Sequence, residues 1–289
     1  MRRSAFIASA FACALPQFAD AATIDQKIER IERWSTGRIS AVAQRIGDAA
    51  PAVSYHPGVV APAASTIKLV ILETVFAAAD SDATILHAKI PIRGSDIVGG
   101  SDRYAHAVPG RRYAIGPILH AMIAQSDNTA ANALITYLGF ARINQTAQAL
   151  GMSATRLGRH FSDSPPVWRI SENRTSAADL ATIVLDIARG ARSGNSQLVS
   201  QAGCKHMLAL MLDQEDHTKI ARGLPPGTRL ANKTGEVSHV RNDVGIVDPG
   251  RTGEYVIAVI VHGLDYDGRG DEAIARVTHA IDPIMRPVR

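Results

Sequence analysis

The stretch Ser65-Thr66-Ile67-Lys68 begins an apolar segment that continues to Ala79. The segment is apolar on nearly every side, which predicts a buried helix over residues 65–79. Positions i and i+3 share one face of a helix, so we expect the Lys68 amine to reach the Ser65 hydroxyl. A serine hydroxyl is a poor nucleophile until a neighbouring base takes its proton. The pattern S-x-x-K therefore suits a nucleophilic serine, although it also occurs by chance on exposed helices.

Two further motifs follow in the same chain. Ser126-Asp127-Asn128 comes 61 residues after Ser65, where two predicted helices meet, and Lys233-Thr234-Gly235 comes 107 residues later in a predicted strand. Taken alone, Ser, Asp and Asn are ordinary helix caps, and Lys-Thr-Gly is a frequent strand end or turn. Three motifs in this order, each in a suitable element, indicate an acyl-transfer site built on serine.

Each polar side chain of the first two motifs has an expected task. Lys68 acts as a base only when neutral, and burial beside the cation Lys233 would lower its pKa towards that state. The Ser126 hydroxyl would relay a proton to the leaving nitrogen. Asn128 would hold the substrate amide and Lys68, whereas Asp127 would brace the loop.

The third motif is expected to bind substrate. Lys233 and Thr234 suit a substrate carboxylate, and Gly235 leaves room for the substrate to lie against the strand edge. The backbone N–H groups of Glu236 and Ser65 would then form an oxyanion hole, which stabilises the charge that develops during acyl transfer.

The order of elements predicts an α/β (α+β) protein. An antiparallel sheet would carry the N- and C-terminal helices, and a long helical insertion would form a second lobe. We expect the α/β lobe at about 22–60 and 215–289, and the helical lobe at about 61–214, with the active site in the cleft between them. The expected helices are 23–34, 65–79, 115–125, 129–138, 175–188, 199–212 and one at the C-terminus, and the expected strands are 38–46, 52–56, 230–234, 240–247 and 255–261.

The N-terminus has the features of a secretory signal. Arg2 and Arg3 precede an apolar run that ends near Phe18, and Ala19-Asp20-Ala21 supplies small residues for cleavage. We therefore expect residues 1–21 to be removed and the mature chain, 22–289, to be secreted or periplasmic. A buried N-terminal helix and a lipid anchor on Cys13 are the alternatives.

Composition excludes several other classes. The chain is 46% hydrophobic and 20% charged, with a net charge of +4 and cationic residues that are scattered apart from Arg111-Arg112. We expect no nucleic-acid partner, since neither a basic face nor a known module is present. Cys204 has no intramolecular partner once Cys13 leaves with the signal. No metal-ligand spacing is evident, so we expect no metal. The N-terminal apolar run is too short to span a bilayer, so we expect no stable membrane span. We also expect no cofactor and a monomer.

Together the motifs resemble the superfamily of class A β-lactamases and penicillin-binding proteins, whose signatures are S-x-x-K, S-D-N and K-T-G. The stretches Gln125-Ser126-Asp127-Asn128-Thr129-Ala130-Ala131-Asn132 and Thr155-Arg156-Leu157-Gly158-Arg159 are especially similar, the second to the start of the family's Ω-loop. The resemblance implies an exported serine hydrolase that opens β-lactam rings through an acyl-enzyme on Ser65 and confers antibiotic resistance. Its substrate would be a small β-lactam or a peptidoglycan-derived molecule.

One departure from the family pattern bears on turnover. Class A enzymes carry a glutamate two residues after the Ω-loop arginine, and it activates the water that frees the acyl-enzyme. Counting from Arg159, that position is Phe161, which cannot act as a base. We hypothesise that Asp163 takes this role through a shifted loop; the alternative is a solvated loop carboxylate. Glu172 is expected to brace the loop or to cap the next helix.

This departure keeps other functions open. The chain fits a penicillin-binding-type D-alanyl-D-alanine peptidase, or an esterase, that releases its acyl group slowly. It also fits a non-catalytic sensor that is acylated and stays so. A second departure is Val244, where some relatives place an arginine that grips the carboxylate. Arg241 is a candidate substitute, although strand alternation puts it on the opposite face.

Overall fold

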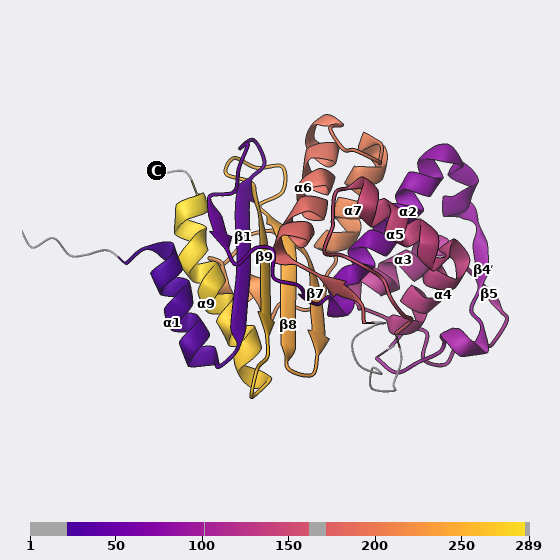
Figure 1. Cartoon of the computed structure of the whole chain (residues 1–289). Coiled ribbons are helices and arrows are strands. Elements are labelled where there is room, and N and C mark those ends of the chain that lie inside the picture. Colours follow the sequence, from indigo (N-terminus) through magenta and orange to yellow (C-terminus); the bar gives the residue numbers. More distant parts are fainter. Residues whose placement is uncertain (1–21, 101, 162–171, 287–289) are drawn as a thin grey trace, which may run out of the picture.

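A five-stranded antiparallel sheet forms one half of the molecule (Figure 1). The computed structural model describes residues 22–100, 102–161 and 172–286. Every strand of this sheet pairs antiparallel with its neighbours, in the order β2-β1-β9-β8-β7. The strands are β1 (Arg38–Arg45), β2 (Val53–Tyr55), β7 (Leu230–Val237), β8 (Val240–Val247) and β9 (Tyr255–His262).

Alternation along the strands divides the core into two parts. In β9 the side chains of Val256, Ala258 and Ile260 belong to one apolar cluster. Their neighbours Ile257 and Val259 belong to a second cluster on the other face. Successive side chains of a strand point to opposite faces, so a strand buried on both sides must be apolar throughout. This explains the continuous apolar runs in the sequence.

One face of the sheet is covered by the two terminal helices. They are α1 (Ile24–Ser35) and α9 (Gly268–Met285), which lie side by side in Figure 1. The expected capping box is present: Thr23 and Gln26 exchange backbone-to-side-chain hydrogen bonds at the start of α1. These helices join segments from opposite ends of the chain into one layer.

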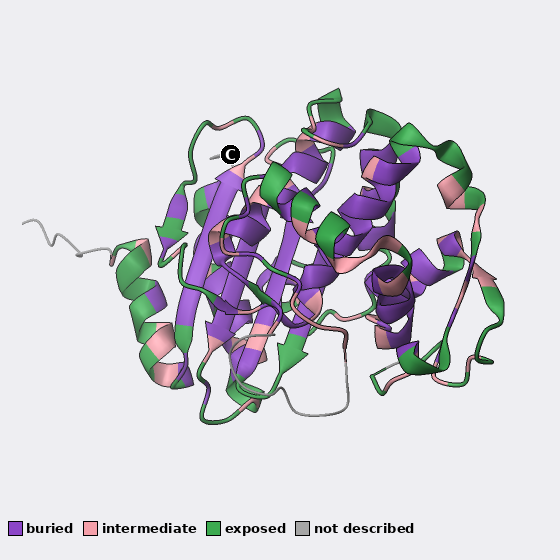
Figure 2. Cartoon of the chain, turned by 45° about the vertical axis from the view of Figure 1, so that its right-hand side comes forward, coloured by how far each residue is buried: buried purple, intermediate pink, exposed green. Residues whose placement is uncertain are grey.

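The other face is covered by α6 (Ala177–Ser193), beyond which the remaining long helices form a compact group. Figure 2 shows a group that is largely buried inside, with exposed residues towards the solvent; its helix over residues 68–81 is buried at nearly every position. The group contains α2 (Lys68–Ser81), α3 (Ile115–Ala124), α4 (Asn128–Leu138), α5 (Phe140–Ala149) and α7 (Gln201–Leu212). The predicted fold class, an antiparallel sheet with flanking helices and an inserted helical region, is confirmed.

Some elements were not predicted. Helix α5 has only Ile143, Thr146 and Ala147 buried, so it lacks the long apolar run that marks its neighbours. The other elements are too short for periodicity to reveal them. They are the paired strands β3 (Ala61–Pro62) and β6 (Arg174–Thr175), the paired strands β4 (Lys89–Pro91) and β5 (Arg112–Ala114), the 3₁₀ turns η1 (Ala64–Ile67), η2 (Ala83–His87) and η3 (Gly94–Asp96), and α8 (Ile220–Gly223).

The predicted signal, residues 1–21 with Cys13, lies outside the described residues. Within the described ranges, no helix combines the length and the apolarity that crossing a bilayer requires. Cys204 is buried.

A buried carboxyl lies inside the helical region, away from the three motifs. Glu73 of α2 is fully buried, and neither of its carboxyl oxygens finds a hydrogen-bond partner among the described residues. Burial, with smaller contributions from Asp186 and Asp80, raises the pKa of Glu73 to about 8. The side chain is therefore neutral in the folded protein at neutral pH and ionised in the unfolded chain.

This difference predicts a pH-dependent stability. A carboxyl whose pKa is raised by folding contributes stability below its unfolded pKa of about 4.5, and that stability is lost as the pH rises towards 8. Between pH 5 and pH 8 the free energy of unfolding of the wild type should fall by about a few kcal/mol because of Glu73, and we expect this fall to be absent in Glu73→Gln. Urea unfolding at both pH values measures it, with the exposed Glu29→Gln as control. Equal pH slopes in wild type and Glu73→Gln would contradict the expectation.

Candidate active site

The predicted nucleophile lies in a 3₁₀ turn rather than in an α-helix. Ser65 belongs to η1, and α2 begins only at Lys68. Side chains at i and i+3 eclipse one another in a 3₁₀ turn, which places the two residues directly one above the other. The Lys68 Nζ and Ser65 Oγ atoms are 3.1 Å apart. Ala64, immediately before the serine, has a left-handed φ of 47°, so the turn is held in an unfavourable backbone conformation.

Lys68 is the most constrained side chain of the site. It is fully buried, and its Nζ lies 2.6 Å from Ser126 O, 3.2 Å from Ser126 Oγ and 2.8 Å from Asn128 Oδ1. Burial, reinforced by the charge of Lys233, lowers the pKa of Lys68 well below its usual value. A neutral amine has a lone pair, so it can accept a proton from the Ser65 hydroxyl.

Ser126 lies in the connection between α3 and α4. Its φ is 58°, a left-handed conformation that is costly for a residue with a side chain. Asp127 braces this connection, since its carboxylate accepts from the backbone N–H groups of Ala130 (2.7 Å), Arg103 (3.1 Å) and Tyr104 (3.0 Å). The brace predicted for Asp127 is thus present, and it holds Ser126 facing the nucleophile.

Lys233 connects strand β7 to the serines. It is fully buried and donates to Ser126 Oγ and to Thr234 O, both at 3.0 Å. Burial lowers the pKa of Lys233 to about 8, although the nearby Asp243 carboxyl partly offsets this effect. The Ser126 hydroxyl therefore lies between two amines, Lys68 and Lys233, through which a proton can move.

Gly235 and Glu236 bring the edge of β7 against the nucleophile. A Cβ on Gly235 would lie only 3.0 Å from the backbone nitrogens of Ser65 and Thr66. Val237 pairs with Val240 across a two-residue turn, and hydrogen-bonded pairs alternate along an antiparallel ladder. The N–H of Glu236 therefore points away from β8, on the edge of β7 that Gly235 brings close to Ser65. This is the arrangement expected of an oxyanion hole.

The close approach at Gly235 yields a testable prediction. In Gly235→Ala, the added methyl group must push the strand edge away from η1. Small displacements in an acyl-transfer site cost about ten- to a hundredfold in rate, so we expect acylation of Ser65 to slow by that factor. The rate of adduct formation with a penicillin measures it. Gly116→Ala, on α3 with open space around it, is the control; a Gly235→Ala rate equal to that of Gly116→Ala would refute the expectation.

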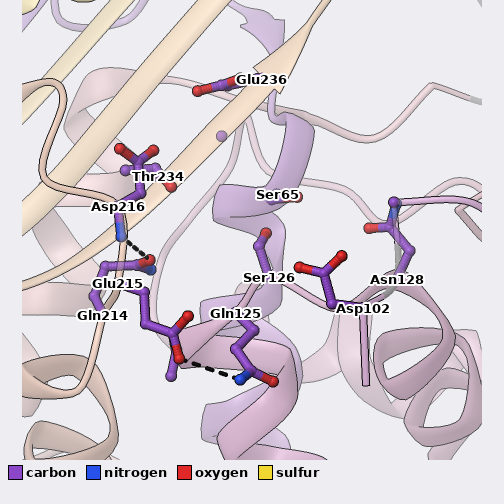
Figure 3. A pocket seen from close by; sticks show the side chains of 13 residues that line it. Ser65, Asp102, Gln125, Ser126, Asn128, Gln214, Glu215, Asp216, Thr234 and Glu236 are labelled. Atoms are coloured by element: carbon purple, nitrogen blue, oxygen red, sulfur yellow. Dashed lines mark hydrogen bonds between the residues drawn. The ribbon is translucent and has the colours of Figure 1, made fainter. Parts of the chain in front are cut away.

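These residues border a cavity of about 470 Å³ (Figure 3). Lys68 and Lys233 are buried and do not line it, but both contact Ser126, which does. Six of the predicted residues line it, together with side chains from the loop after α7. The lining consists of Ser65, Gly100, Asp102, Ala124, Gln125, Ser126, Asn128, Gln214, Glu215, Asp216, Thr234, Gly235 and Glu236.

Phe161 occupies the position over Lys68 that the family pattern assigns to a glutamate. The Lys68 Nζ lies 4.4 Å from the centre of the phenyl ring. The Asn132 side chain holds the Phe161 backbone in place, because its Oδ1 accepts from Phe161 N (2.8 Å) and its Nδ2 donates to Phe161 O (2.9 Å). No oxygen or nitrogen of the Phe161 side chain is available to activate water. Asp163, the proposed substitute base, lies outside the described residues.

The loop arginine and Glu172 form the expected brace. Arg159 Nη2 lies 3.2 Å from both carboxylate oxygens of Glu172. The Asn173 side chain adds to it by accepting from the backbone N–H groups of Gly158 (2.8 Å) and Arg159 (3.0 Å). These bonds close the two described ends of the loop onto one another.

Arg241 does not lie where a substrate carboxylate would bind. Its guanidinium donates to the carbonyls of Val237 (2.9 Å) and Val240 (2.8 Å), and its side chain packs against Gly270 of α9. Val244 is buried in the core on the opposite face of the sheet. Strand alternation therefore separates the two positions, and Arg241 does not substitute for an arginine at 244.

Lys219 is a charged residue of the site that the sequence did not reveal. It is fully buried and donates to Asp216 Oδ2 (2.7 Å) and to the Glu236 carboxylate, with Asp271 at 3.5 Å. Burial alone would lower the pKa of Lys219, but the hydrogen bonds to Asp216 and Glu236 raise it. The ammonium thus ties the loop before α8 to the edge of β7. No local motif marks it, because its partners come from three separate segments.

No group of three His, Cys, Asp or Glu side chains in the described ranges could hold a metal ion. The assembled chemistry consists of a hydroxyl, two low-pKa amines and backbone donors. These groups suit acyl transfer to serine.

Comparison with known proteins is consistent with this chemistry. Residues 23–283 match the model of the Beta-lactamase enzyme family. A β-lactamase of Proteus vulgaris is 25% identical over 254 residues, which cover 86% of this chain and 81% of that protein. Among solved structures, a β-lactamase from Sphaerobacter thermophilus has a TM-score of 0.80 at 28% identity, covering 91% of this chain and 96% of the other.

A second type of relative is nearly as similar in structure. A protein named PBP-A has a TM-score of 0.78 at 28% identity, covering 89% of this chain and 95% of the other. A variant of PBP-A, with the same similarity, was solved as an acyl-enzyme complex with penicillin G.

Proposed function

Because the chain belongs to the Beta-lactamase enzyme family, and is thus a serine hydrolase, we propose that it opens β-lactam rings through an acyl-enzyme on Ser65. The observation that carries this proposal is the position of Lys68. Its fully buried amine, whose pKa is well below the usual value, lies 3.1 Å from Ser65 Oγ and 3.2 Å from Ser126 Oγ. A neutral amine between two hydroxyls is what acylation of serine requires.

In the acylation step, Ser65 Oγ bonds to the carbonyl carbon of the β-lactam. Lys68 takes the hydroxyl proton as the bond forms. The negative charge on the carbonyl oxygen is stabilised by the N–H groups of Ser65 and Glu236. The ring C–N bond then breaks, and the nitrogen receives a proton from Ser126, which regains one from Lys68. The substrate carboxylate lies against Lys233 and Thr234.

Release requires a water molecule to attack the ester. The water adds to the acyl carbon, the bond to Ser65 Oγ breaks, and Ser65 regains a proton, leaving the opened acid. The phenyl ring of Phe161 lies over Lys68, so no base is held at the position the family pattern uses for this step. The proposed alternative base is Asp163.

The position of Phe161 favours a second candidate function. If no other base serves, the acyl-enzyme is long-lived towards β-lactams, as in a penicillin-binding-type enzyme. The natural reaction would then be cleavage of a D-alanyl-D-alanine peptide or of an ester. Similarity to PBP-A, a variant of which forms an acyl-enzyme with penicillin G, supports this candidate.

We also propose that the mature protein is exported and acts as a monomer. The basic start, the apolar run and the small residues at 19–21 support cleavage of residues 1–21. Export would place the site where cell-wall peptides and β-lactam drugs occur, and activity there would confer resistance.

Intact-mass measurement after addition of one equivalent of a penicillin tests these proposals. An adduct on Ser65 that disappears within seconds, while the drug is consumed, supports the β-lactamase function. An adduct that persists for hours supports the second candidate, and turnover of a D-alanyl peptide or a simple ester then identifies the substrate. Absence of any adduct at Ser65, with no consumption of the drug, contradicts both candidates.

A further inference from the structure

The charged side chains that line the catalytic cavity carry one sign. Asp102, Glu215, Asp216 and Glu236 all border it, and none of its described lining residues is a lysine or an arginine. A cavity lined by charges of one sign concentrates ligands of the opposite sign. The proposed place of the substrate carboxylate is at Lys233 and Thr234, so a carboxylate of the rim that contacts the substrate would contact another part of it.

Three of the four carboxylates already have strong donors. Glu215 accepts from Gln125 Nε2 at 3.1 Å. Asp216 and Glu236 are both bound by Lys219. Each of these three carboxylates therefore has a hydrogen-bond donor before any substrate arrives, although the single charge of Lys219 is shared between Asp216 and Glu236 and the donor to Glu215 is a neutral amide.

Asp102 differs from the other three. Its side chain is exposed, and it has no hydrogen bond or ion pair with any described residue. Its loop is nevertheless held in place by the next motif: Asn128 Nδ2 donates to Gly99 O at 3.0 Å, Asn128 N donates to Gly100 O at 3.2 Å, and Asp127 accepts from Arg103 N at 3.1 Å. Figure 3 shows the Asp102 carboxylate directed at the space beside Ser65 and Ser126.

The position of Asp102 in the cavity indicates which part of the substrate it would contact. In Figure 3, Thr234 and Asp102 lie on opposite sides of Ser65 and Ser126. In a penicillin, the carboxylate is attached through the ring to the leaving nitrogen, so the acyl side chain extends away from Thr234. A substrate seated in this way displaces water from Asp102. A carboxylate that loses water without gaining a donor is costly, and an ammonium group removes that cost.

We propose that Asp102 recognises an ammonium group on the acyl side of the scissile carbonyl. The preferred substrates are then zwitterionic, with a carboxylate at Lys233 and Thr234 and an amine at Asp102. This inference rests on the proposed function, since that function sets the direction of the substrate. It applies equally to amino-penicillins and to peptides that carry a free amine before the cleaved bond.

Two penicillins that differ by one amine test the proposal. Ampicillin carries an α-ammonium group where penicillin G has hydrogen. The measurement is the second-order rate constant for acylation of Ser65 by each drug, at a pH where the amine is protonated, expressed as the ratio of ampicillin to penicillin G. We expect Asp102→Asn to lower this ratio about fivefold, the size of a partly exposed ion pair, and Asp102→Lys to lower it further. Asp265→Asn, another exposed loop aspartate without a described partner and outside the cavity, should keep the wild-type ratio.

The possible results distinguish a failure of the role proposed for Asp102 from a failure of the proposed function. The inference is supported if the ratio decreases from wild type to Asp102→Asn and again to Asp102→Lys. It also requires that lowering the salt concentration raises the ratio more in wild type than in Asp102→Asn. A ratio unaffected by either substitution, with Ser65 still acylated by both drugs, overturns the inference and leaves the proposed function standing. If neither drug acylates Ser65 in the wild-type protein, the proposed function fails, and the inference fails with it. Thermal unfolding of each variant checks that the exposed loop change leaves the fold intact.

Discussion

Replacing Lys68 by methionine is expected to slow acylation of Ser65 by about a thousandfold or more, the contribution of a positioned general base to an activated nucleophile. Methionine keeps the length of the side chain and removes the amine. The Ser65 hydroxyl then loses the group 3.1 Å away that takes its proton, and Ser126 loses the group that returns one. The rate of adduct formation with a penicillin, followed by intact mass, measures the effect.

The same lysine should control the pH dependence in wild type. Burial and Lys233 lower the pKa of Lys68, so the amine is neutral over a range in which an ordinary lysine is charged. Acylation should therefore fall as the pH drops through the lowered pKa of Lys68 and the amine becomes protonated. If Lys68 is the base, the residual acylation rate of Lys68→Met should no longer show this decrease at low pH.

The control for Lys68→Met is Lys205→Met, which makes the same chemical change at an exposed position of α7. Removing Lys68 also leaves Ser126 O and Asn128 Oδ1 without their donor, so thermal unfolding of the variant must be measured. Acylation by a folded Lys68→Met at a rate within tenfold of Lys205→Met would rule out Lys68 as the base.

Replacing Phe161 by glutamate is expected to release the Ser65 acyl-enzyme about a hundredfold faster, the lower range for a general base brought within one water of its target. The Asn132 side chain fixes the backbone of residue 161 from both sides. A glutamate there would extend towards Lys68, where the phenyl ring now lies, with a carboxylate able to hold and activate water. The lifetime of the penicillin adduct measures deacylation directly.

Phe161→Gln distinguishes the effect of a base at position 161 from the effect of removing the phenyl ring. Glutamine opens the same volume and holds water but cannot take a proton. We expect little acceleration in Phe161→Gln, and in Phe161→Glu an acceleration that disappears as the pH falls below the pKa of a glutamate. Equal acceleration in both variants would mean that the phenyl ring acts only by excluding water. If the wild-type adduct is already released within seconds, Asp163→Ala shows whether Asp163 supplies the base.

Much of the fold was accessible from the sequence. The apolar run after Ser65, the capping box at Thr23 and Gln26, and the β-branched strands before the C-terminus all carry strong local patterns. Helix α5 was missed because little of its surface is buried, and the two-stranded ribbons because two or three residues show no period. The predicted start of α2 was three residues too early, because residues at i and i+3 are neighbours both in a 3₁₀ turn and in an α-helix.

The sequence by itself determined which chemical groups are available: a serine followed by a lysine at i+3, the Ser-Asp-Asn and Lys-Thr-Gly motifs, and an aromatic residue at position 161. Local spacing carries this information because side chains three residues apart on a helix are neighbours in any fold. Only the tertiary structure decided the rest. It buried Lys68 and Lys233 against one hydroxyl, which lowers the pKa of both amines, and it enclosed Lys219 among carboxylates from three segments. The apolar run and the motifs already suggested a buried Lys68 beside Lys233, but the hydroxyl that both amines contact and the carboxylates around Lys219 depend on residues distant in the chain, so no local pattern predicts them.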